Sequence, residues 1–343
     1  MASVAVIAGD GIGRDVVAEV LPVLGAIGGL DVEELPWGAE YYLETGITVP
    51  PGGYDTLRSF DAVFMGALGD PRVPDNRHAR DILLGTRFQL DLYVNYRPVR
   101  LLDDRLSPLK NRGRADIDFV VFRENTEGLY TGAGGSIATG SEHEIAIQED
   151  VNTYRGVHRI IRYAFEYAAA RGLRTVCMAD KSNAMTFGHA LWQRVFKEVA
   201  PQFPSIAATH LYIDALAMFL VQDPGQFEVI VTNNLFGDII TDIGGALQGG
   251  LGMAASGNIH PGRTSMFEPV HGSAPPLAGR DIANPIGAIL SAALMLETLG
   301  RPDDARRIER AVEGAVHAGE TTRDVGGTLG TREAGKAVLR RMT

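Results

Sequence analysis

The chain opens with VAVIAGDGIG, residues Val4–Gly13, an apolar run that ends in three glycines. An apolar run of this length, closed by a glycine turn, is typical of a buried strand, and the pattern over 14–25 predicts a helix after it. Strand patterns at Leu30–Glu34 and Asp61–Met65 alternate with further helical patterns. The sequence therefore predicts an α/β fold with parallel strands.

This glycine loop begins like a Rossmann nucleotide-binding fingerprint but departs from it. The third glycine of the fingerprint is replaced by Arg14, and no ribose-binding acid is obvious about twenty residues further on. A tight strand-to-helix turn is the simpler interpretation. A nucleotide-binding role has to be argued from other residues.

Length and composition limit the class of protein. The 343 residues are 45% hydrophobic and 22% charged, which suits two domains with a core each. The net charge of −10 argues against nucleic acid as a partner. The one cysteine, Cys177, cannot form an internal disulfide, and the N-terminal apolar run is too short for a signal peptide or a membrane span. We expect a cytoplasmic protein with no membrane partner.

The middle and end of the chain carry further patterns. Strand-like runs at 92–100 and 117–122 continue the α/β pattern, and strong helical patterns cover Pro285–Leu299 and Asp303–Ala318. Residues 131–150 differ, since a stretch rich in Gly, Ser and Thr precedes alternating polar and apolar residues. This segment predicts a projecting hairpin.

The stretch NNLFGDIITD, Asn233–Asp242, holds two carboxylates four residues apart. On a helix, Asp238 and Asp242 share a face and repel each other unless a cation lies between them. Asp214, at the end of a strand-like run, is a candidate third ligand. Ligands that are all oxygen suit Mg²⁺ or Mn²⁺. The alternative is a pair of acids that interacts with the helix dipole.

Three arginines stand in otherwise apolar surroundings: Arg87, Arg97 and Arg123. A planar guanidinium matches a carboxylate, so a substrate with two carboxylates would explain several arginines. Ion pairs with the nearby Asp91 or Glu124 explain any one of them equally well.

Tyr130 and Lys181 are candidates for acid–base chemistry. Each taken alone is normally structural or solvated. A lysine beside a metal and other cations has a lowered pKa and can act as a base. These two residues therefore depend on the rest of the site for their interpretation.

Taken together, these motifs resemble the β-decarboxylating dehydrogenases that act on isopropylmalate, isocitrate, homoisocitrate and tartrate or D-malate. The resemblance covers nearly the whole chain, and the order and spacing of the motifs make it specific. The matching segments are Gly9–Gly13, Asp91–Pro98, Arg123–Tyr130, Lys181–Asn183, Asn234–Asp242 and Phe267–Pro275.

The resemblance implies an isopropylmalate dehydrogenase-like two-domain α/β fold that is not a Rossmann fold. A discontinuous large domain would bind the dinucleotide and comprise residues 1–98 and 250–343. A small domain over 99–249 would hold the dimer interface, with an arm at about 131–150 that clasps a partner. The active sites of the homodimer would be shared, with Lys181 and Asp214 contributed by the second subunit.

The resemblance also implies a role for each candidate residue. Tyr130 and Lys181 would be the catalytic acid–base pair, and Asp214, Asp238 and Asp242 would hold Mg²⁺ or Mn²⁺. The residues implied to bind substrate are Leu83, Leu84, Arg87, Arg97, Arg123 and Ala184. The residues implied to lie along the dinucleotide are Glu268, His271, Gly272, Ser273, Ala274, Pro276, Leu277 and Asn284.

One departure from the family pattern concerns the cofactor. NAD enzymes of this family usually carry an aspartate where this chain has Pro276, and NADP isocitrate enzymes carry Lys-Tyr where it has Pro276-Leu277. A 2′-phosphate needs cationic donors, and the sequence shows none at this spot. We therefore expect NAD, with NADP as the alternative.

A second departure concerns the substrate. Leu83, Leu84 and the partner's Ala184 would form an apolar wall as in isopropylmalate enzymes, whereas Arg80 falls where those enzymes commonly carry an acid. We expect a hydroxy di- or tricarboxylate as substrate and favour 3-isopropylmalate, converted to 2-oxo-4-methylpentanoate as in leucine biosynthesis. The alternatives are tartrate or D-malate, another 3-substituted malate such as isocitrate, homoisocitrate or a specialised-metabolite precursor, and a non-catalytic regulatory subunit.

Overall fold

The computed structural model describes residues 1–342, which form two compact units. The second unit comprises Tyr93–Asn95 and Asp118–Ile243, and the first comprises the rest of the chain. These bounds differ from the expected domains, because residues 99–117 and 244–249 lie in the first unit and residues 93–95 lie in the second. The 99–117 segment is held there by hydrogen bonds, since the Arg105 guanidinium donates to the carbonyls of Val316 at 2.6 Å and Val325 at 2.9 Å.

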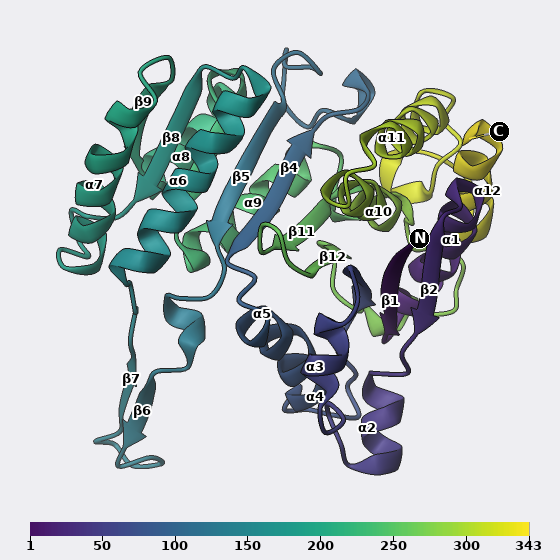
Figure 1. The fold of residues 1–343 in the computed structure, drawn as a ribbon, viewed down its shortest axis with the longest axis horizontal. Coiled ribbons are helices and arrows are strands. Elements are labelled where there is room, and N and C mark those ends of the chain that lie inside the picture. The colour runs from purple at the N-terminus through teal and green to yellow at the C-terminus, as the bar shows by residue number, and fades with distance from the viewer. Residues whose placement is uncertain (343) are drawn as a thin grey trace. The chain divides into compact units, whose positions relative to one another are not determined.

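In the first unit the strands follow the order β2-β1-β3-β12-β11-β4 (Figure 1). β1 pairs in parallel with β2 and β3, and β3 pairs in parallel with β12, while β11 and β12 are antiparallel. All six residues of β3 are buried, as expected for a strand covered on both faces. The strands are β1 (Ala2–Gly9), β2 (Leu30–Glu34), β3 (Ala62–Ala67), β4 (Val94–Arg100, in this unit from Tyr96), β11 (Ala255–Ile259) and β12 (Ser265–Pro269).

The helices of this unit pack on that sheet and on one another. α10 is buried on nearly all sides and contacts β11, β12, α1 and α11, which explains its almost wholly apolar sequence. The helices are α1 (Ile12–Ile27), α2 (Ala39–Thr45), α3 (Gly53–Arg58), α4 (Arg77–Ala79), α5 (Gly85–Gln89), α10 (Ile286–Thr298), α11 (Pro302–His317) and α12 (Thr331–Met342). None of the helices within residues 1–342 is both long and apolar enough to cross a membrane.

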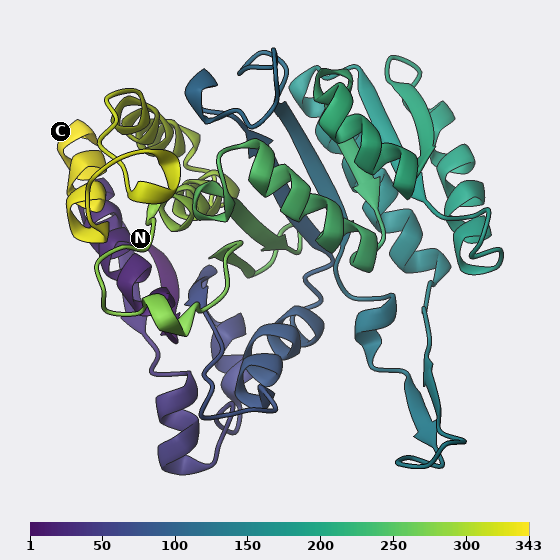
Figure 2. The same cartoon turned by 180° about the vertical axis from the view of Figure 1, so that it is seen from behind.

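In the second unit four parallel strands follow the order β5-β10-β8-β9. Figure 1 shows α6 and α7 in front of these strands, and Figure 2, from behind, shows α8 and α9 on the other face. The elements are β5 (Asp118–Glu124), β8 (Thr175–Asp180), β9 (Ala207–Tyr212), β10 (Val229–Thr232), α6 (Tyr154–Arg171), α7 (Gly188–Val199), α8 (Ile213–Gln222) and α9 (Asn234–Leu247). The prediction of an α/β fold with parallel strands is confirmed.

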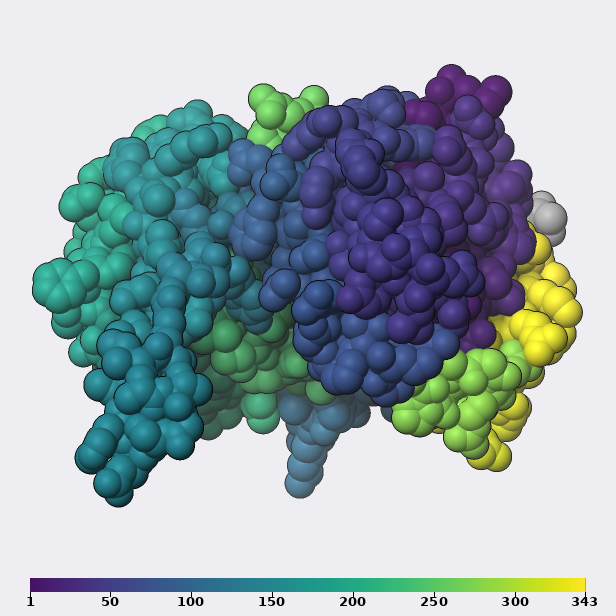
Figure 3. Space-filling model, turned by 90° about the horizontal axis from the view of Figure 1, so that it is seen from below, coloured from purple at the N-terminus to yellow at the C-terminus, as the bar shows by residue number. Residues whose placement is uncertain are grey.

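The segment 131–150 forms a two-stranded antiparallel hairpin of β6 (Gly134–Ile137) and β7 (Ile145–Gln148). Figure 3 shows it projecting from the surface as a narrow arm. The prediction of a hairpin is confirmed. All eight of its strand residues are exposed, including three isoleucines, so this apolar surface has no cover within the described chain.

Candidate active site

The glycine loop after β1 is shaped by close packing of backbone. A Cβ on Gly9 would lie 2.2 Å from the carbonyl oxygen of Ala67, and one on Gly11 would lie 2.0 Å from that of Ser273. Both glycines also have positive φ, at 74° and 53°. The glycines thus let two neighbouring loops approach, which supports the tight-turn interpretation of this stretch.

Within this loop, Asp10 is a buried carboxylate that joins three segments. It accepts hydrogen bonds from the backbone N–H of Ala39 at 2.7 Å and of Gly69 at 2.9 Å. Its Oδ2 also lies 2.8 Å from Nε2 of His78, which is fully buried in α4. Sequence reasoning missed both residues, and the only available signal was an acid inside an otherwise apolar turn.

The helical segment over residues 77–89 contains one π-helical turn, Arg80–Leu84, between α4 and α5. The Tyr54 hydroxyl donates to the Asp81 carbonyl in this turn at 2.7 Å. A Cβ on Gly85 would lie 2.1 Å from that hydroxyl oxygen, so glycine makes room for the contact. Wide turns of this kind are frequent at functional sites.

Leu83 and Leu84 lie in this π-helical turn and are half-buried. Leu83 packs against the core cluster that contains Ile82, so the core fixes its position. The Arg80 side chain is 67% exposed, with its Nε 3.5 Å from the Asp81 carboxylate. The arginine therefore extends into solvent while the leucines do not.

Arg87 follows in α5 and is 6% exposed. Its guanidinium donates to the Glu268 carboxylate at 2.8 Å, and the Asn258 side-chain amide donates to the same oxygen at 2.9 Å. Arg87 therefore pairs with Glu268, and not with Asp91 or Glu124, the two partners considered from sequence. Arg97 in β4 is also buried, at 7% exposed.

The loop after β12 carries most of the residues expected along a dinucleotide. Burial lowers the pKa of His271, which favours its neutral form. Ala274 has a positive φ of 36°, and the Gly272 Cα faces open space. The Asn284 side chain accepts the N–H of Ile286, the first residue of α10, at 3.0 Å.

Pro276 and Leu277 lie in a single 3₁₀ turn, Pro275–Leu277, and Leu277 is 37% exposed. The Arg280 guanidinium donates to the Pro276 carbonyl at 3.4 Å. The guanidinium of Arg280 therefore lies beside Pro276, although positions 276 and 277 themselves carry no cation. The turn of the backbone brings Arg280 to this position, and the residues at 276 and 277 alone do not indicate it.

In the second unit, Arg123 and Asp238 form the centre of a polar cluster. Arg123, 1% exposed in β5, donates to the Asp238 carboxylate and, through Nε, to the Asn234 side chain at 2.8 Å. The Tyr130 hydroxyl donates to the other Asp238 oxygen at 2.7 Å. Gly237 permits this approach, because a Cβ there would lie 2.5 Å from that of Arg123. We call Arg123, Tyr130, Asn234 and Asp238 the arginine cluster.

Glu124, beside the arginine cluster, is the strand's last residue and is buried. Burial raises the pKa of this carboxyl to about 7, although the N–H groups of Thr126 and Glu127 donate to it at 2.7–3.1 Å. Arg159 lies 3.9 Å away. These bonds shape the turn that leads toward Tyr130.

Lys181 and Asp214 form a separate pair. Lys181 Nζ donates to the Asp214 carboxylate at 2.6 Å and holds the pKa of that carboxyl below its ordinary value. The side chains are 28% and 66% exposed. Among residues 1–342, no three His, Cys, Asp or Glu side chains gather as metal ligands. Asp214 therefore does not meet Asp238 and Asp242 within one chain.

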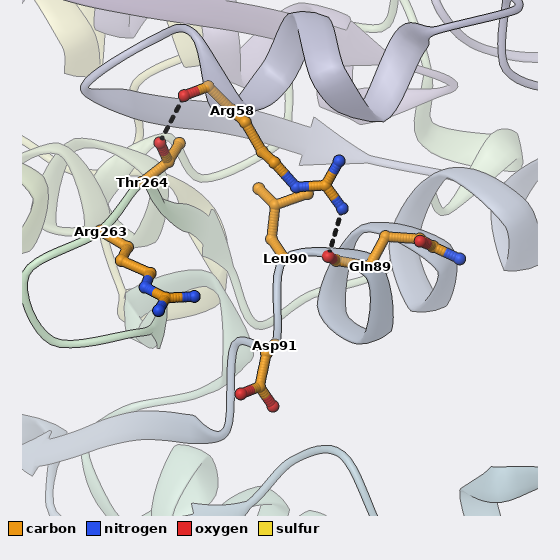
Figure 4. Close-up of a pocket in the computed structure, with 6 residues that line it drawn as sticks. All are labelled: Arg58, Gln89, Leu90, Asp91, Arg263 and Thr264. Atoms are coloured by element: carbon orange, nitrogen blue, oxygen red, sulfur yellow. Dashed lines mark hydrogen bonds between the residues drawn. The ribbon is translucent and has the colours of Figure 1, made fainter.

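One cavity of about 290 Å³ in the first unit lies away from the expected site residues (Figure 4). Arg58 donates across it to the Gln89 carbonyl at 2.5 Å, and the Thr264 hydroxyl donates to the Arg58 carbonyl at 3.2 Å. Its lining residues are Arg58, Gln89, Leu90, Asp91, Arg263 and Thr264. None of them is an expected site residue.

Comparison with known proteins gives a consistent result. The isocitrate/isopropylmalate dehydrogenase family model matches residues 3–338. The chain is 48% identical to 3-isopropylmalate dehydrogenase of Streptomyces coelicolor over 97% of this chain and 99% of the relative, and 48% identical to that of Corynebacterium glutamicum over 98% of each. The crystal structure of isocitrate dehydrogenase from Methylococcus capsulatus is 35% identical, with a TM-score of 0.91 over 100% of this chain and 99% of the other. The chain therefore belongs to the isocitrate/isopropylmalate dehydrogenase family.

Proposed function

We propose that this chain is an NAD-dependent, metal-requiring enzyme that oxidatively decarboxylates 3-isopropylmalate to 2-oxo-4-methylpentanoate. The observation that carries the proposal is the similarity to relatives named 3-isopropylmalate dehydrogenase, at 46–50% identity over at least 90% of the chain. The arginine cluster and the Lys181–Asp214 pair support it, because both contain the groups that this reaction needs.

The residues present suit a hard divalent cation. Asp238 and Asp242 lie one turn apart on α9, both have solvent-accessible carboxylates, and each offers oxygen ligands only. Asp214 would complete the set from a second copy of the chain, because it does not meet the other two within its own chain. The exposed apolar arm suits such a homodimer with shared active sites.

The side chains have distinct proposed tasks. Arg87, Arg97 and Arg123 would bind the two substrate carboxylates, and Glu268 would exchange its ion pair with Arg87 for contacts along the dinucleotide. When bound, the cation polarises the substrate's 2-oxygen and the nicotinamide accepts the hydride. Lys181 would take the 2-hydroxyl proton.

After oxidation, carbon dioxide leaves from the carbon that carries the isopropyl group, and this carbon then needs a proton. The Tyr130 hydroxyl, held by Asp238, would supply it. The dinucleotide would bind along the loop after β12 and the start of α10. The residues proposed for this role are His271, Gly272, Ser273, Ala274, Pro276, Leu277 and Asn284. Because Arg280 lies beside Pro276, we expect only a modest preference for NAD over NADP.

The test is a panel of isopropylmalate, D-malate, tartrate, isocitrate and homoisocitrate, each assayed with NAD and NADP in the presence of Mg²⁺ or Mn²⁺. We expect the highest kcat/KM with isopropylmalate and NAD. A higher kcat/KM for tartrate or D-malate would refute the proposal that isopropylmalate is the substrate, and a higher kcat/KM with NADP would refute the preference for NAD. No turnover of any of these acids would refute the proposal that the chain is an enzyme.

A further inference from the structure

A histidine that the proposed reaction does not use lies directly behind Lys181. His189, in the first turn of α7, is fully buried. Its Nδ1 accepts the backbone N–H of Lys181 at 2.8 Å. A ring nitrogen that accepts a hydrogen bond carries no proton, so the neutral ring has its proton on Nε2.

The opposite side of the ring faces two other segments. Nε2 lies 3.1 Å from the side-chain nitrogen of Asn233, which precedes α9, and 3.7 Å from the carboxylate of Asp150, at the base of the arm. Burial acts to raise the pKa of Asp150, but the nearby His189 ring and the hydrogen bond from the Asn152 side chain outweigh it and keep this pKa below its ordinary value. The charged carboxylate therefore suits a proton on Nε2.

The Lys181 turn is also held through its neighbour Asp180, whose carboxylate accepts the Ser182 N–H at 2.9 Å. It follows β8, and within the turn the N–H groups of Ala184 and Met185 both donate to the Lys181 carbonyl. The Lys181 N–H itself is held by the His189 ring. The direction of the Lys181 backbone sets where the four-carbon side chain starts and so limits the positions that Nζ can reach.

We infer that His189 is a positioning residue that sets Lys181 in place for proton abstraction, through the hydrogen bond that its Nδ1 accepts from the Lys181 N–H. The inference rests on the proposed function. A misplacement of about 1 Å costs on the order of a hundredfold in rate, so the expected signature is a lower kcat with little change in the KM for substrate.

Side-chain replacements test the role of Nδ1 directly. His189→Asn keeps an acceptor close to the Nδ1 position, whereas His189→Phe keeps a ring and removes the acceptor. We expect kcat to stay within about threefold of wild type for the first variant and to fall about tenfold to a hundredfold for the second, with KM nearly constant. If His189→Phe does not fold, His189→Gln replaces it, because Gln reaches the Nε2 position instead.

A matched control comes from the same helix. Val195 is fully buried on α7. Val195→Ala removes two buried methyl groups without touching Lys181 or His189, so it should lower the melting temperature and leave kcat within about threefold. Equal kcat losses in this control and in His189→Phe would overturn the inference.

Mixed dimers show whether His189 acts on the active site that contains the Lys181 of its own subunit. If Lys181 acts in the partner's site, a dimer of His189→Phe with Tyr130→Phe keeps one complete site, whereas a dimer of His189→Phe with Lys181→Ala keeps none. We expect the first mixture to recover activity and the second not to, and the reverse pattern would overturn the inference. A Lys181→Ala and Tyr130→Phe mixture checks site sharing separately. If that mixture does not recover, site sharing fails and the kcat ratio of the His189 variants alone decides.

Discussion

The helical segment 77–89 in the first unit and the arginine cluster in the second are built in different ways. The segment is irregular, with a π-helical turn, and Tyr54 from outside it holds one of its carbonyls. The arginine cluster lies between a regular strand and a regular helix, and Asp238 receives hydrogen bonds from both Arg123 and Tyr130. The π-helical turn of the first region offers the apolar side chains of Leu83 and Leu84, and the second region offers charge.

This difference suggests a division of labour. Charged groups at a reaction centre act on atoms that every 2-hydroxy acid of the family shares, so their loss should affect all substrates alike. Apolar side chains contact only the variable substituent and change the ratio between substrates. We therefore expect substitutions in the arginine cluster to lower all rates together and substitutions of Leu83 and Leu84 to change selectivity.

The largest effects should come from the acid–base pair. Tyr130→Phe and Lys181→Ala should each lower kcat by about 10²–10⁴-fold, the usual contribution of a positioned acid or base. The loss should be similar for isopropylmalate and D-malate. A steady-state assay with both acids checks this. A tenfold difference between the loss of kcat for isopropylmalate and that for D-malate would contradict the proposal that the charged groups act on all substrates alike.

Asp238→Asn should give the next largest effect, and it concerns the metal. The substitution removes a negative charge from the proposed ligand set, so the Mg²⁺ concentration needed for half-maximal activity should rise about tenfold or more. Activity should also disappear in excess chelator and return when Mg²⁺ is added. Full activity of the wild-type enzyme in chelator would show that no metal is needed.

The sequence predicted the regular parts of both regions. Alternating apolar runs gave the α/β class, and the Gly-Ser-Thr composition of 131–150 gave the hairpin, because such patterns depend on neighbours along the chain. The contacts between distant residues were not accessible in this way. The Arg87–Glu268 ion pair joins residues 181 positions apart and has no local signal, whereas the contact of Arg280 with Pro276 spans only four positions.

The same limit explains the residues that were missed. Asp10 and His78 are 68 positions apart and meet only because two loops pack on Gly9 and Gly11. The π-helical turn is also invisible in the hydrophobic pattern, since it widens the helix by one residue without changing which residues are apolar. The motifs in the sequence therefore predicted the candidate site residues. They did not predict the residues that hold those site residues in position.

Leu83→Asn should change the selectivity between isopropylmalate and D-malate. An isopropyl group buried against Leu83 and Leu84 gains about 0.8 kcal/mol for each methyl or methylene equivalent removed from water. The substitution should lower kcat/KM for isopropylmalate about tenfold more than for D-malate. Arg80→Ala is the matched control, because this exposed side chain should change the ratio of the two values less than threefold.

The smallest expected effect concerns the support of the π-helical turn. Burial raises the pKa of Tyr54, so its hydroxyl stays protonated at neutral pH and donates to the Asp81 carbonyl. Tyr54→Phe removes this one hydrogen bond, worth about 0.5–1.5 kcal/mol, and leaves the carbonyl free to rejoin a narrower turn. Leu83 and Leu84 would then shift, and the ratio of kcat/KM for isopropylmalate to that for D-malate should change about twofold to tenfold. Tyr41→Phe is the control, since no hydrogen bond from the Tyr41 hydroxyl is present within residues 1–342. Because the π-helical turn carries no catalytic group, kcat for D-malate should stay nearly constant in both variants. An equal fall in kcat/KM for isopropylmalate and D-malate would show that Tyr54 acts on the reaction itself and not on selectivity.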